Sequence, residues 1–285
     1  MKSVIIIAAM MLSCIVSGIA HPGIGIVHDS KGNVYFTDLA QVWKITADGR
    51  KTIVVPNVHT HELFMDDNDN LFGEHLWYNG EQKNTWSHYV WKLTTSTARV
   101  EKVIPDKEGL RENYSFVRDH FGTMYWQGGN EHCQTIERKG RNNQVARVGS
   151  SCFENIRAMH ALADGSLAVV DFQDLKQVDK QGKVTTIASR MANPDWKEFS
   201  RDNQHSVMGV WDDADGNLYT AVSHLRLIKK FGKDGKESVP FKSTFPWAPS
   251  GGMVDANGQL WVLEFNPLNS VRVQRVDVSG NVKTF

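Results

Sequence analysis

The sequence of 285 residues lacks several features that mark particular protein classes. Its 32 Lys and Arg balance 32 Asp and Glu, so it has no excess positive charge with which to neutralise nucleic-acid phosphates. Only 8 Pro and 23 Gly exclude collagen-like and low-complexity chains. Hydrophobic residues (41%) and charged residues (22%) are in the ordinary globular range. We therefore expect a monomeric globular protein that binds a small molecule and no nucleic acid.

Long apolar runs are also scarce, and the one present lies at the N-terminus. Lys2 precedes the apolar run Val4–Val16, and small residues at Gly18 and Ala20 fit a cleavage site after Ala20. This pattern predicts a secretory signal peptide over residues 1–20 and a secreted or periplasmic protein, with no membrane span in the mature chain. A membrane anchor and a lipoprotein modified at Cys14 are the alternatives, but the run is shorter than the roughly 20 residues that span a bilayer.

Cysteine is rare, with three residues in the whole chain. Removal of the signal peptide leaves Cys133 and Cys152, and an even pair in an exported protein predicts one disulfide. Two buried free thiols are the alternative. A disulfide that closes a loop of about 20 residues is expected to stabilise the fold by roughly 3 kcal/mol.

What the sequence does contain is an internal repeat. A strand, a tight turn and a second strand recur six times, with first residues about 38 to 53 positions apart, at residues 25–38, 63–75, 116–127, 161–171, 210–221 and 253–264. Repeats of this length are typical of arrays in which each unit packs on its neighbours. The acidic stretch 66–70 falls on one of these turns. It lacks the Gly and Glu that a calcium-binding EF-hand loop needs at its sixth and twelfth positions, so we interpret it as a β-turn.

Each unit continues with two more strands. In the first unit they flank the turn Asp48-Gly49, and in the last unit they flank 279–281 and end at Phe285. Four strands per unit predict an all-β protein, a six-bladed β-propeller of four-stranded antiparallel blades that forms a single domain over residues 21–285. Each blade would be built from its own contiguous segment. One helix is expected at 193–201, with Asn193 as its N-cap and Pro194 in its first turn.

The opening segment His21-Pro-Gly-Ile-Gly-Ile26 and the motif Asp29-Ser-Lys-Gly-Asn-Val-Tyr-Phe-Thr-Asp38 resemble NHL-repeat propellers. In overall plan, residues 21–285 are also similar to the SMP-30/gluconolactonase-like six-bladed group. The resemblance implies the fold, and a range of functions that includes lactonases, lyases, amidating lyases and binding scaffolds. The lactonase-like group has a Glu at the start of the first strand and an Asn and an Asp in later blades. Asn113 and Asp171 could match the later residues, whereas Glu62 is displaced from the position of the Glu and lies among histidines. The amidating-lyase pattern would use these residues: His61, His160, His205, Tyr114 and Arg157.

Aligned repeats place polar residues where the first strand of each blade begins and the second strand ends. In a propeller these positions meet at one mouth of the central channel, so we expect a site there. Its predicted members are His59, His61, Glu62, Asn113, Tyr114, Arg157, His160, His205, Ser250, Asp38, Glu74, His75, Asp171 and Glu264.

A divalent metal is one expectation for this mouth. His59 and His61 would share one face of a strand, and His160 or His205 would complete a set of imidazole ligands. Zn or Ca would be the metal, with Cu as a further possibility. After cleavage at Ala20, the amine and ring of His21 could also chelate Cu(II). Hydrated polar residues in the channel, with no metal, are the alternative.

The predicted function is a secreted or periplasmic metal-dependent lyase or hydrolase of lactonase type, acting on a small molecule at the channel mouth. The candidate catalytic residues are Glu62, Tyr114, Arg157, Asp171 and Glu264, since carboxylates can act as general bases or hold metal ligands in place. The alternative is a propeller that binds a small molecule or a protein without catalysis. The sequence contains no nucleophile elbow, phosphate loop or dinucleotide fingerprint that would identify a substrate.

Overall fold

A computed structural model describes residues 22–109, 117–130, 132–198, 200 and 203–285. The predicted signal peptide, His21, Asn113 and Tyr114 lie outside the described residues. Within the described ranges, no helix is long and apolar enough to cross a membrane.

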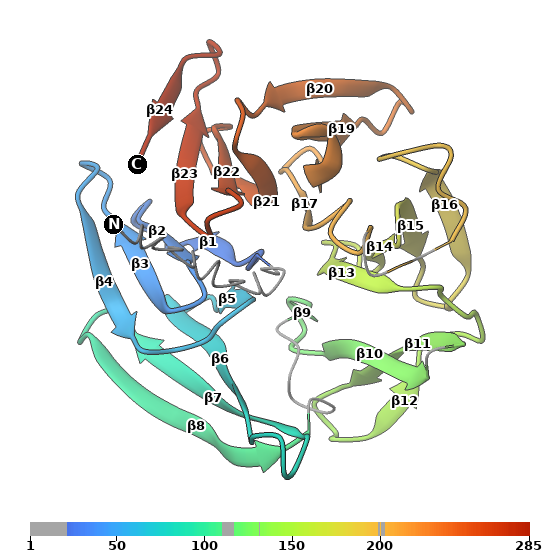
Figure 1. The fold of residues 1–285 in the computed structure, drawn as a ribbon, viewed down its shortest axis with the longest axis horizontal. Coiled ribbons are helices and arrows are strands. Elements are labelled where there is room, and N and C mark those ends of the chain that lie inside the picture. Colours follow the sequence, from blue (N-terminus) through green and yellow to red (C-terminus); the bar gives the residue numbers. More distant parts are fainter. Residues whose placement is uncertain (1–21, 110–116, 131, 199, 201–202) are drawn as a thin grey trace, which may run out of the picture.

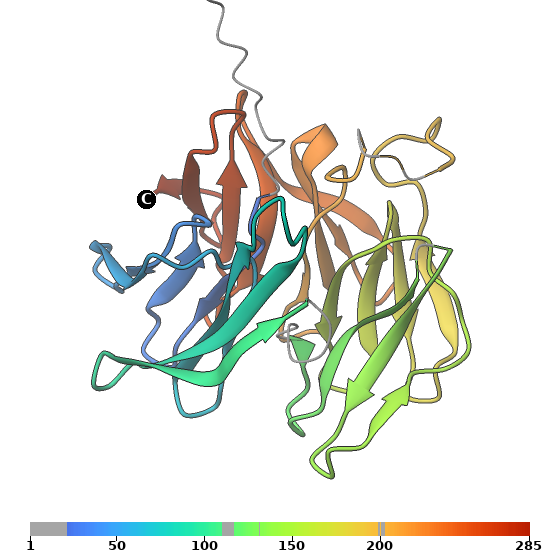
Figure 2. The same cartoon turned by 60° about the horizontal axis from the view of Figure 1, so that its bottom comes forward.

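Six antiparallel sheets of four strands stand around a common axis (Figure 1). Within each sheet the strands are hydrogen-bonded in chain order, from the innermost strand at the axis to the outermost strand at the rim. The predicted all-β six-bladed propeller is confirmed, and every blade is built from one contiguous segment. The strands of blade 2 are among the longest, with 9, 9 and 10 residues in its second, third and outermost strands, and they sweep outward in Figure 2.

The two inner strands of each blade line or approach the axis. The innermost strands are β1 (Ile26–His28), β5 (Leu63–Met65), β9 (Val117–Arg118), β13 (Ile156–Ala161), β17 (Val210–Asp212) and β21 (Ala248–Val254). The second strands are β2 (Val34–Thr37), β6 (Asn70–Tyr78), β10 (Met124–Asn130), β14 (Leu167–Asp171), β18 (Leu218–Val222) and β22 (Leu260–Phe265).

The two outer strands of each blade complete the sheets. The third strands are β3 (Gln41–Ile45), β7 (Trp86–Thr94), β11 (Cys133–Lys139), β15 (Asp174–Val178), β19 (Leu227–Phe231) and β23 (Val271–Val276). The outermost strands are β4 (Lys51–Pro56), β8 (Arg99–Glu108), β12 (Val145–Arg147), β16 (Val184–Ala188), β20 (Glu237–Lys242) and β24 (Val282–Thr284). One 3₁₀ helix, η1 (Ser223–Leu225), follows β18.

An aspartate builds the turn between the first two strands in five of the blades. In each case its Oδ1 accepts the backbone N–H groups two and four residues further on, at 2.8 to 3.1 Å, and the five residues are Asp29, Asp66, Asp119, Asp213 and Asp255. This side chain satisfies donors that the hairpin leaves unpaired, which explains why the motif recurs in the sequence. The β-turn predicted at 66–70 is therefore confirmed.

The blades adhere through apolar side chains that interdigitate between neighbouring sheets. At the seam where the ends of the chain meet, Ile26 and Phe36 of blade 1 share a buried cluster with Trp261 and Leu263 of blade 6. The Ser250 hydroxyl donates to the Gly23 carbonyl across the same seam, at 2.8 Å. The ring thus closes by packing, as predicted, without a strand borrowed from another blade.

The helix predicted at 193–201 is absent from the described part of that segment, so this prediction is wrong. Asn193 accepts from the Asp195 N–H at 2.9 Å, but it caps only a single turn. The buried side chain of Gln173 accepts from the Asn193 N–H and donates to the Trp196 carbonyl, at 3.0 and 2.7 Å. These tertiary hydrogen bonds capture the groups that would otherwise propagate a helix.

The predicted disulfide between Cys133 and Cys152 is present, with Cα atoms 4.8 Å apart. Beside it, Gln134 and Phe153 form a backbone bridge, with hydrogen bonds of 3.1 and 2.9 Å. The Gln134 side chain also accepts from the Ile156 N–H at 2.6 Å. The disulfide therefore anchors the loop that leads directly into β13.

Candidate functional site

The channel contains a cavity of about 690 Å³ at the end where the innermost strands begin. We call it the first cavity. Of the predicted site residues, it is lined by His61, Glu62, Arg157 and His205. Gln134 and the indoles of Trp86 and Trp126 also line it, and sequence reasoning missed all three. Trp86 begins β7 in the long hairpin of blade 2, whose unusual length was the available sequence signal.

His59 and His61 lie in the segment before β5, and not on a strand as predicted. Their rings nevertheless meet edge to face, with centroids 4.7 Å apart. The His59 N–H donates to Nδ1 of His75 at 2.9 Å, and the His61 carbonyl accepts from the N–H groups of Ile24 and Gly25 at 2.9 Å. The segment is thus tied both to its own blade and to blade 1.

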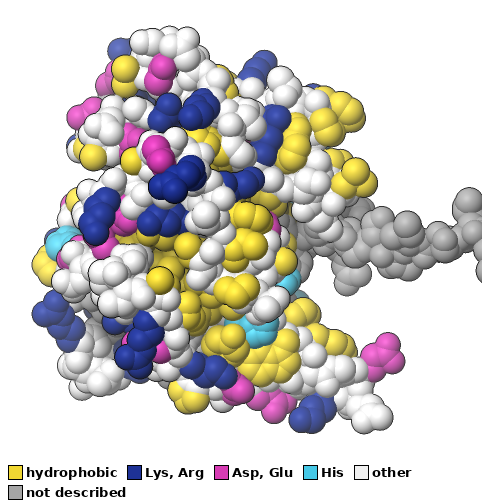
Figure 3. Space-filling view, turned by 90° about the vertical axis from the view of Figure 1, so that its left-hand side faces the viewer, with side chains coloured by type: hydrophobic (Ala, Val, Ile, Leu, Met, Phe, Trp, Pro, Cys, Tyr) yellow, Lys and Arg dark blue, Asp and Glu magenta, His cyan; other side chains and the backbone are white. Residues whose placement is uncertain are grey.

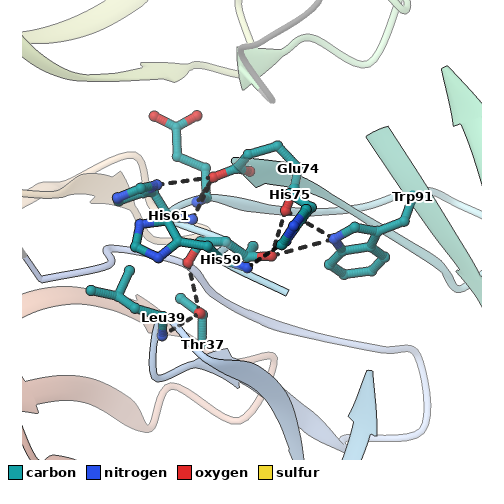
Figure 4. A network of polar contacts seen from close by, with 9 residues as sticks. Thr37, Leu39, His59, His61, Glu74, His75 and Trp91 are labelled. Atoms are coloured by element: carbon teal, nitrogen blue, oxygen red, sulfur yellow. Dashed lines mark hydrogen bonds and ion pairs between the residues drawn. The ribbon is translucent and has the colours of Figure 1, made fainter. Parts of the chain in front are cut away.

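The buried Thr60 between them fixes this segment further (Figure 4). Its hydroxyl donates to the Glu74 carbonyl at 2.6 Å and accepts from the Trp91 indole at 3.3 Å. Its own carbonyl accepts from the Thr37 hydroxyl at 2.7 Å. These hydrogen bonds fix the backbone on either side of His61, and so they fix the position of its side chain in the cavity.

The imidazole of His61 pairs with the carboxylate of Glu74, with 3.3 Å between Nδ1 and Oε1 (Figure 4). Glu74 also accepts the backbone N–H of His61. Burial raises the pKa of Glu74 to about 7, although these backbone hydrogen bonds oppose the shift, and burial lowers the pKa of His61 to about 4. Near neutral pH the imidazole is therefore uncharged, and it lies beside a carboxyl group that is close to half ionised.

Glu74 differs from the other buried carboxylates at the ends of second strands. Asp171 is bound to the Lys176 ammonium, and Glu264 is bound to the Arg272 guanidinium, each at 2.5 Å. Neither Asp171 nor Glu264 lines the first cavity, although both were predicted as catalytic. Their ion pairs serve the packing of blades 4 and 6. Glu74 has a histidine where the others have a strong cation, and this explains its raised pKa.

Arg157 and His205 face the cavity from blade 4 and from the loop before β17. Nη2 of Arg157 lies 3.2 Å from Nδ1 of His205. Because a guanidinium can only donate, Nδ1 of His205 accepts, which places the proton of a neutral ring on Nε2. Arg157 forms no ion pair with a carboxylate of the described residues, and burial lowers its pKa. A largely buried cation without a counter-ion creates a strong preference for an anionic group in the cavity.

His160 lies elsewhere, in contrast to the prediction. The turn after β13 begins at Leu162, as hydrogen bonds from the Leu162 N–H to Ser166 and from the Gly165 N–H to Leu162 show. Arg157 is therefore the residue that matches His61 by position, and His160 lies three residues further along the strand. It lines a second cavity at the opposite end of the channel and bonds Oδ1 of Asp212 at 2.8 Å.

The other predicted site residues that the structure describes form hydrogen bonds or packing contacts within the blades and do not line the first cavity. Asp38 accepts the Trp43 indole N–H at 2.7 Å, and Ser250 is buried in the seam described above. His75 packs with Trp77 and Tyr89, at centroid distances of 5.6 and 5.0 Å. Figure 3, which views the molecule from the left-hand side of Figure 1, shows hydrophobic side chains gathered beside a histidine, with cationic and acidic side chains around them.

The predicted metal ligands do not form a metal site together. In the described part of the chain, no three His, Cys, Asp or Glu side chains are grouped so that they could hold an ion. His160 is in the other cavity, and His205 accepts from a guanidinium whose charge would repel a divalent cation. The set His59, His61, His160 and His205 therefore does not fit Zn, Ca or Cu as a group.

Comparison with known proteins supports the fold and leaves the function open. No family model matches the sequence, and no curated protein matches it. Among solved structures, virginiamycin B lyase from Staphylococcus aureus is similar, with 14% identity, a TM-score of 0.54 and coverage of 93% of this chain and 84% of that chain. A gluconolactonase from Xanthomonas campestris has 12% identity, a TM-score of 0.56 and coverage of 86% and 83%.

An auxiliary nutrient binding protein from Bacteroides thetaiotaomicron is also similar, with 10% identity, a TM-score of 0.59 and coverage of 92% of this chain and 69% of that chain. The structural neighbours thus include SMP-30/gluconolactonase-like propellers and propeller lyases, as the resemblance in the sequence implied. They also include a binding protein. At these identities the likeness extends to the six-bladed fold alone.

Proposed function

We propose that the protein binds a small molecule with a carboxylate or polarised carbonyl group in the first cavity and cleaves it in a lyase or hydrolase reaction. The observation that carries this proposal is the convergence of an uncompensated guanidinium, Arg157, and the His61–Glu74 pair on one cavity. A fixed cation and a neutral base are the two groups that such reactions require.

In this proposal, Arg157 binds the negative oxygen of the substrate. Its guanidinium is held in place by His205 and gains a counter-ion only when the substrate arrives. Negative charge that develops on a carbonyl oxygen would be stabilised in the same way, because the cavity shields the interaction from water. The Trp86 and Trp126 side chains provide apolar surface for the body of the molecule.

His61 is the proposed proton acceptor, and Glu74 is a positioning residue. The lowered pKa keeps the His61 imidazole neutral and able to accept a proton at neutral pH. The Glu74 carboxylate, once ionised, stabilises the imidazolium that forms and orients the ring through Nδ1. Glu62 also lines the cavity and is the candidate general acid: in its protonated form it would donate a proton to the leaving group, and the proton taken up by His61 would then restore it.

The N-terminal leader and the disulfide both support export as the setting of this activity. We propose that the leader is removed after Ala20, which sequencing the N-terminus of the exported protein would test. Divalent-metal dependence is a separate proposal, because His21, the predicted chelator of Cu(II), lies outside the described residues.

The direct test is a proton-release assay on the purified exported protein with a panel of small lactones, esters and hydroxycarboxylates. Turnover is expected for at least one class, and it should be lost in His61→Asn and in Arg157→Gln. The control variant is His120→Asn, which alters an exposed histidine in the β9–β10 turn. Parallel reactions with a chelator, and with added Zn, Ca or Cu ions, test the metal proposal.

A non-catalytic binding propeller is the second candidate, favoured by the ion pairs that occupy Asp171 and Glu264. Its signature would be a ligand that binds in an Arg157-dependent manner and is recovered unchanged. Turnover that persists in both His61→Asn and Arg157→Gln would refute the assignment to this cavity.

A further inference from the structure

The second cavity, of about 340 Å³, lies at the far end of the channel. It is lined by the last residue of every innermost strand: His28, Met65, Arg118, Ala161, Asp212 and Val254. All six blades therefore contribute to one site, although neither the sequence analysis nor the proposed function assigns it a role.

Arg118 is the unusual member of this ring. Its guanidinium lies over the Phe64 ring, with 5.8 Å from Cζ to the ring centroid. It makes no hydrogen bond or ion pair with any residue that the structure describes. Burial lowers its pKa, so no carboxylate compensates for the water that this cation has lost. A guanidinium carries five N–H donors in a planar fork, and here that fork borders an enclosed space.

Two acidic residues line the second cavity, Glu62 and Asp212, and neither forms an ion pair with Arg118 among the described residues. Asp212 accepts from Nε2 of His160 at 2.8 Å, so its carboxylate has a partner in the neighbouring blade. His28 is also engaged, with Nδ1 3.1 Å from the Asp29 carbonyl. Most other lining side chains are apolar, including Phe64, Met65 and Met253. The second cavity thus has mostly apolar walls, two acidic residues, and one guanidinium that forms no ion pair among the described residues.

We infer that the second cavity binds a small carboxylate with an apolar body, held by a bidentate contact from Arg118. A carboxylate matches the guanidinium fork in shape and charge, and charge-assisted pairs of this kind are among the strongest hydrogen bonds in proteins. The apolar walls favour a hydrocarbon or aromatic body over a polyhydroxylated one. The two cavities share Ile24, Glu62 and Met159, but Arg118 lines only the second cavity, so a variant of Arg118 tests this inference separately from the proposed function.

Isothermal titration calorimetry with 3-phenylpropionate, indole-3-acetate and hexanoate tests this inference on the full chain. Each carboxylate is compared with its neutral amide, which has the same shape without the charge. At least one carboxylate is expected to bind about tenfold or more tightly than its amide. Arg118→Gln should abolish that preference. Arg118→Lys retains the positive charge but not the planar fork of N–H donors, so it should keep only part of the preference for the carboxylate over the amide.

Arg226→Gln is the matched control, because Arg226 lies over Phe245 at the same 5.8 Å, with Phe245 exposed on the outside of the protein. Its carboxylate binding should equal that of the wild type. Far-ultraviolet circular dichroism and thermal unfolding show whether each variant is folded. If Arg118→Gln does not fold, Arg118→Lys takes its place in the comparison.

Three outcomes would overturn the inference. The first is that none of the carboxylates binds at millimolar concentration. The second is that Arg118→Gln, or Arg118→Lys in its place, binds as the wild type does. The third is that binding is lost in Arg157→Gln but not in the Arg118 variants, which would place the ligand in the first cavity.

Discussion

Replacing Glu74 with Gln is expected to remove a specific pH dependence from the stability of the protein. The Glu74 side chain is about 1% exposed, and burial raises its pKa from 4.5 to about 7. Between these values the folded protein holds a proton that the unfolded chain has released, so the free energy of unfolding falls as pH rises. A shift of about 2.5 pKa units corresponds to about 3 kcal/mol.

The measurement is urea unfolding of the wild type and Glu74→Gln at pH 5 and pH 8.5. Titrating groups remote from Glu74 are common to both proteins, so their contributions cancel when the two pH-induced changes are compared, and the difference reports the Glu74–His61 pair. The wild type should lose about 2.5 kcal/mol more than the variant between the two conditions, because part of the effect is already present at pH 5. A useful contrast is Glu264→Gln, which leaves the Arg272 guanidinium without its carboxylate and should destabilise the fold at both pH values.

Equal pH dependence in the wild type and Glu74→Gln would refute this account of the pair. It would mean that the carboxyl group ionises in the folded protein as readily as in the unfolded chain. Glu74 would then lack the electrostatic coupling to His61 that the proposed proton transfer needs. If the account holds, the proposed activity should rise with pH as Glu74 ionises near pH 7, because the carboxylate then favours the imidazolium.

Three further substitutions test the scaffold, each by urea or thermal unfolding. Thr60→Val should cost about 1 kcal/mol by deleting a buried hydroxyl that donates at 2.6 Å, and Thr60→Ser should recover most of it. Cys133→Ser opens the disulfide and should cost roughly 3 kcal/mol, whereas an unchanged midpoint would contradict the loop-closure argument. Gly251→Ala places a Cβ 2.2 Å from the Ile24 carbonyl oxygen and should cost about 1–3 kcal/mol, while Gly140→Ala, where the nearest atom is 3.5 Å away, should be close to neutral.

The architecture was predictable from the sequence because its hairpin turns depend on short-range hydrogen bonds that recur from blade to blade. In five blades an aspartate at the start of the first hairpin turn, as at Asp29 and Asp255, bonds to backbone groups only two and four residues away. Such contacts leave a regular pattern in the sequence. The helix predicted at 193–201 failed for the opposite reason, since Gln173, some twenty residues earlier, captures its backbone groups.

The site was only partly predictable because its geometry depends on register. The turn between the first two strands of blade 4 begins at Leu162, whereas the same turn in the other blades begins at an aspartate. The repeat alignment therefore lost its register in blade 4, and it assigned both Arg157 and His160 to the same mouth of the channel. A strand advances about 3.3 Å per residue, so the three-residue offset between Arg157 and His160 places the two side chains about 10 Å apart along the channel. Pattern alone also could not distinguish Glu74 from Glu264, since the difference lies in whether the third strand supplies a cation.

The seam between blades 1 and 6 has a consequence for how such a protein can change over time. Since no strand is shared, each blade is a self-contained cassette, and the chain could begin at any seam without loss of a strand pairing. A cassette duplicated, deleted or exchanged as a unit would carry its own cavity-lining residues with it, and among the described residues only blade 6 lines the second cavity without lining the first. His61 and Arg157 come from blades 2 and 4, and Arg118 comes from blade 3 between them. Exchanging blade 3 alone would therefore replace the guanidinium at one end of the channel while leaving the histidine and arginine at the other end in place.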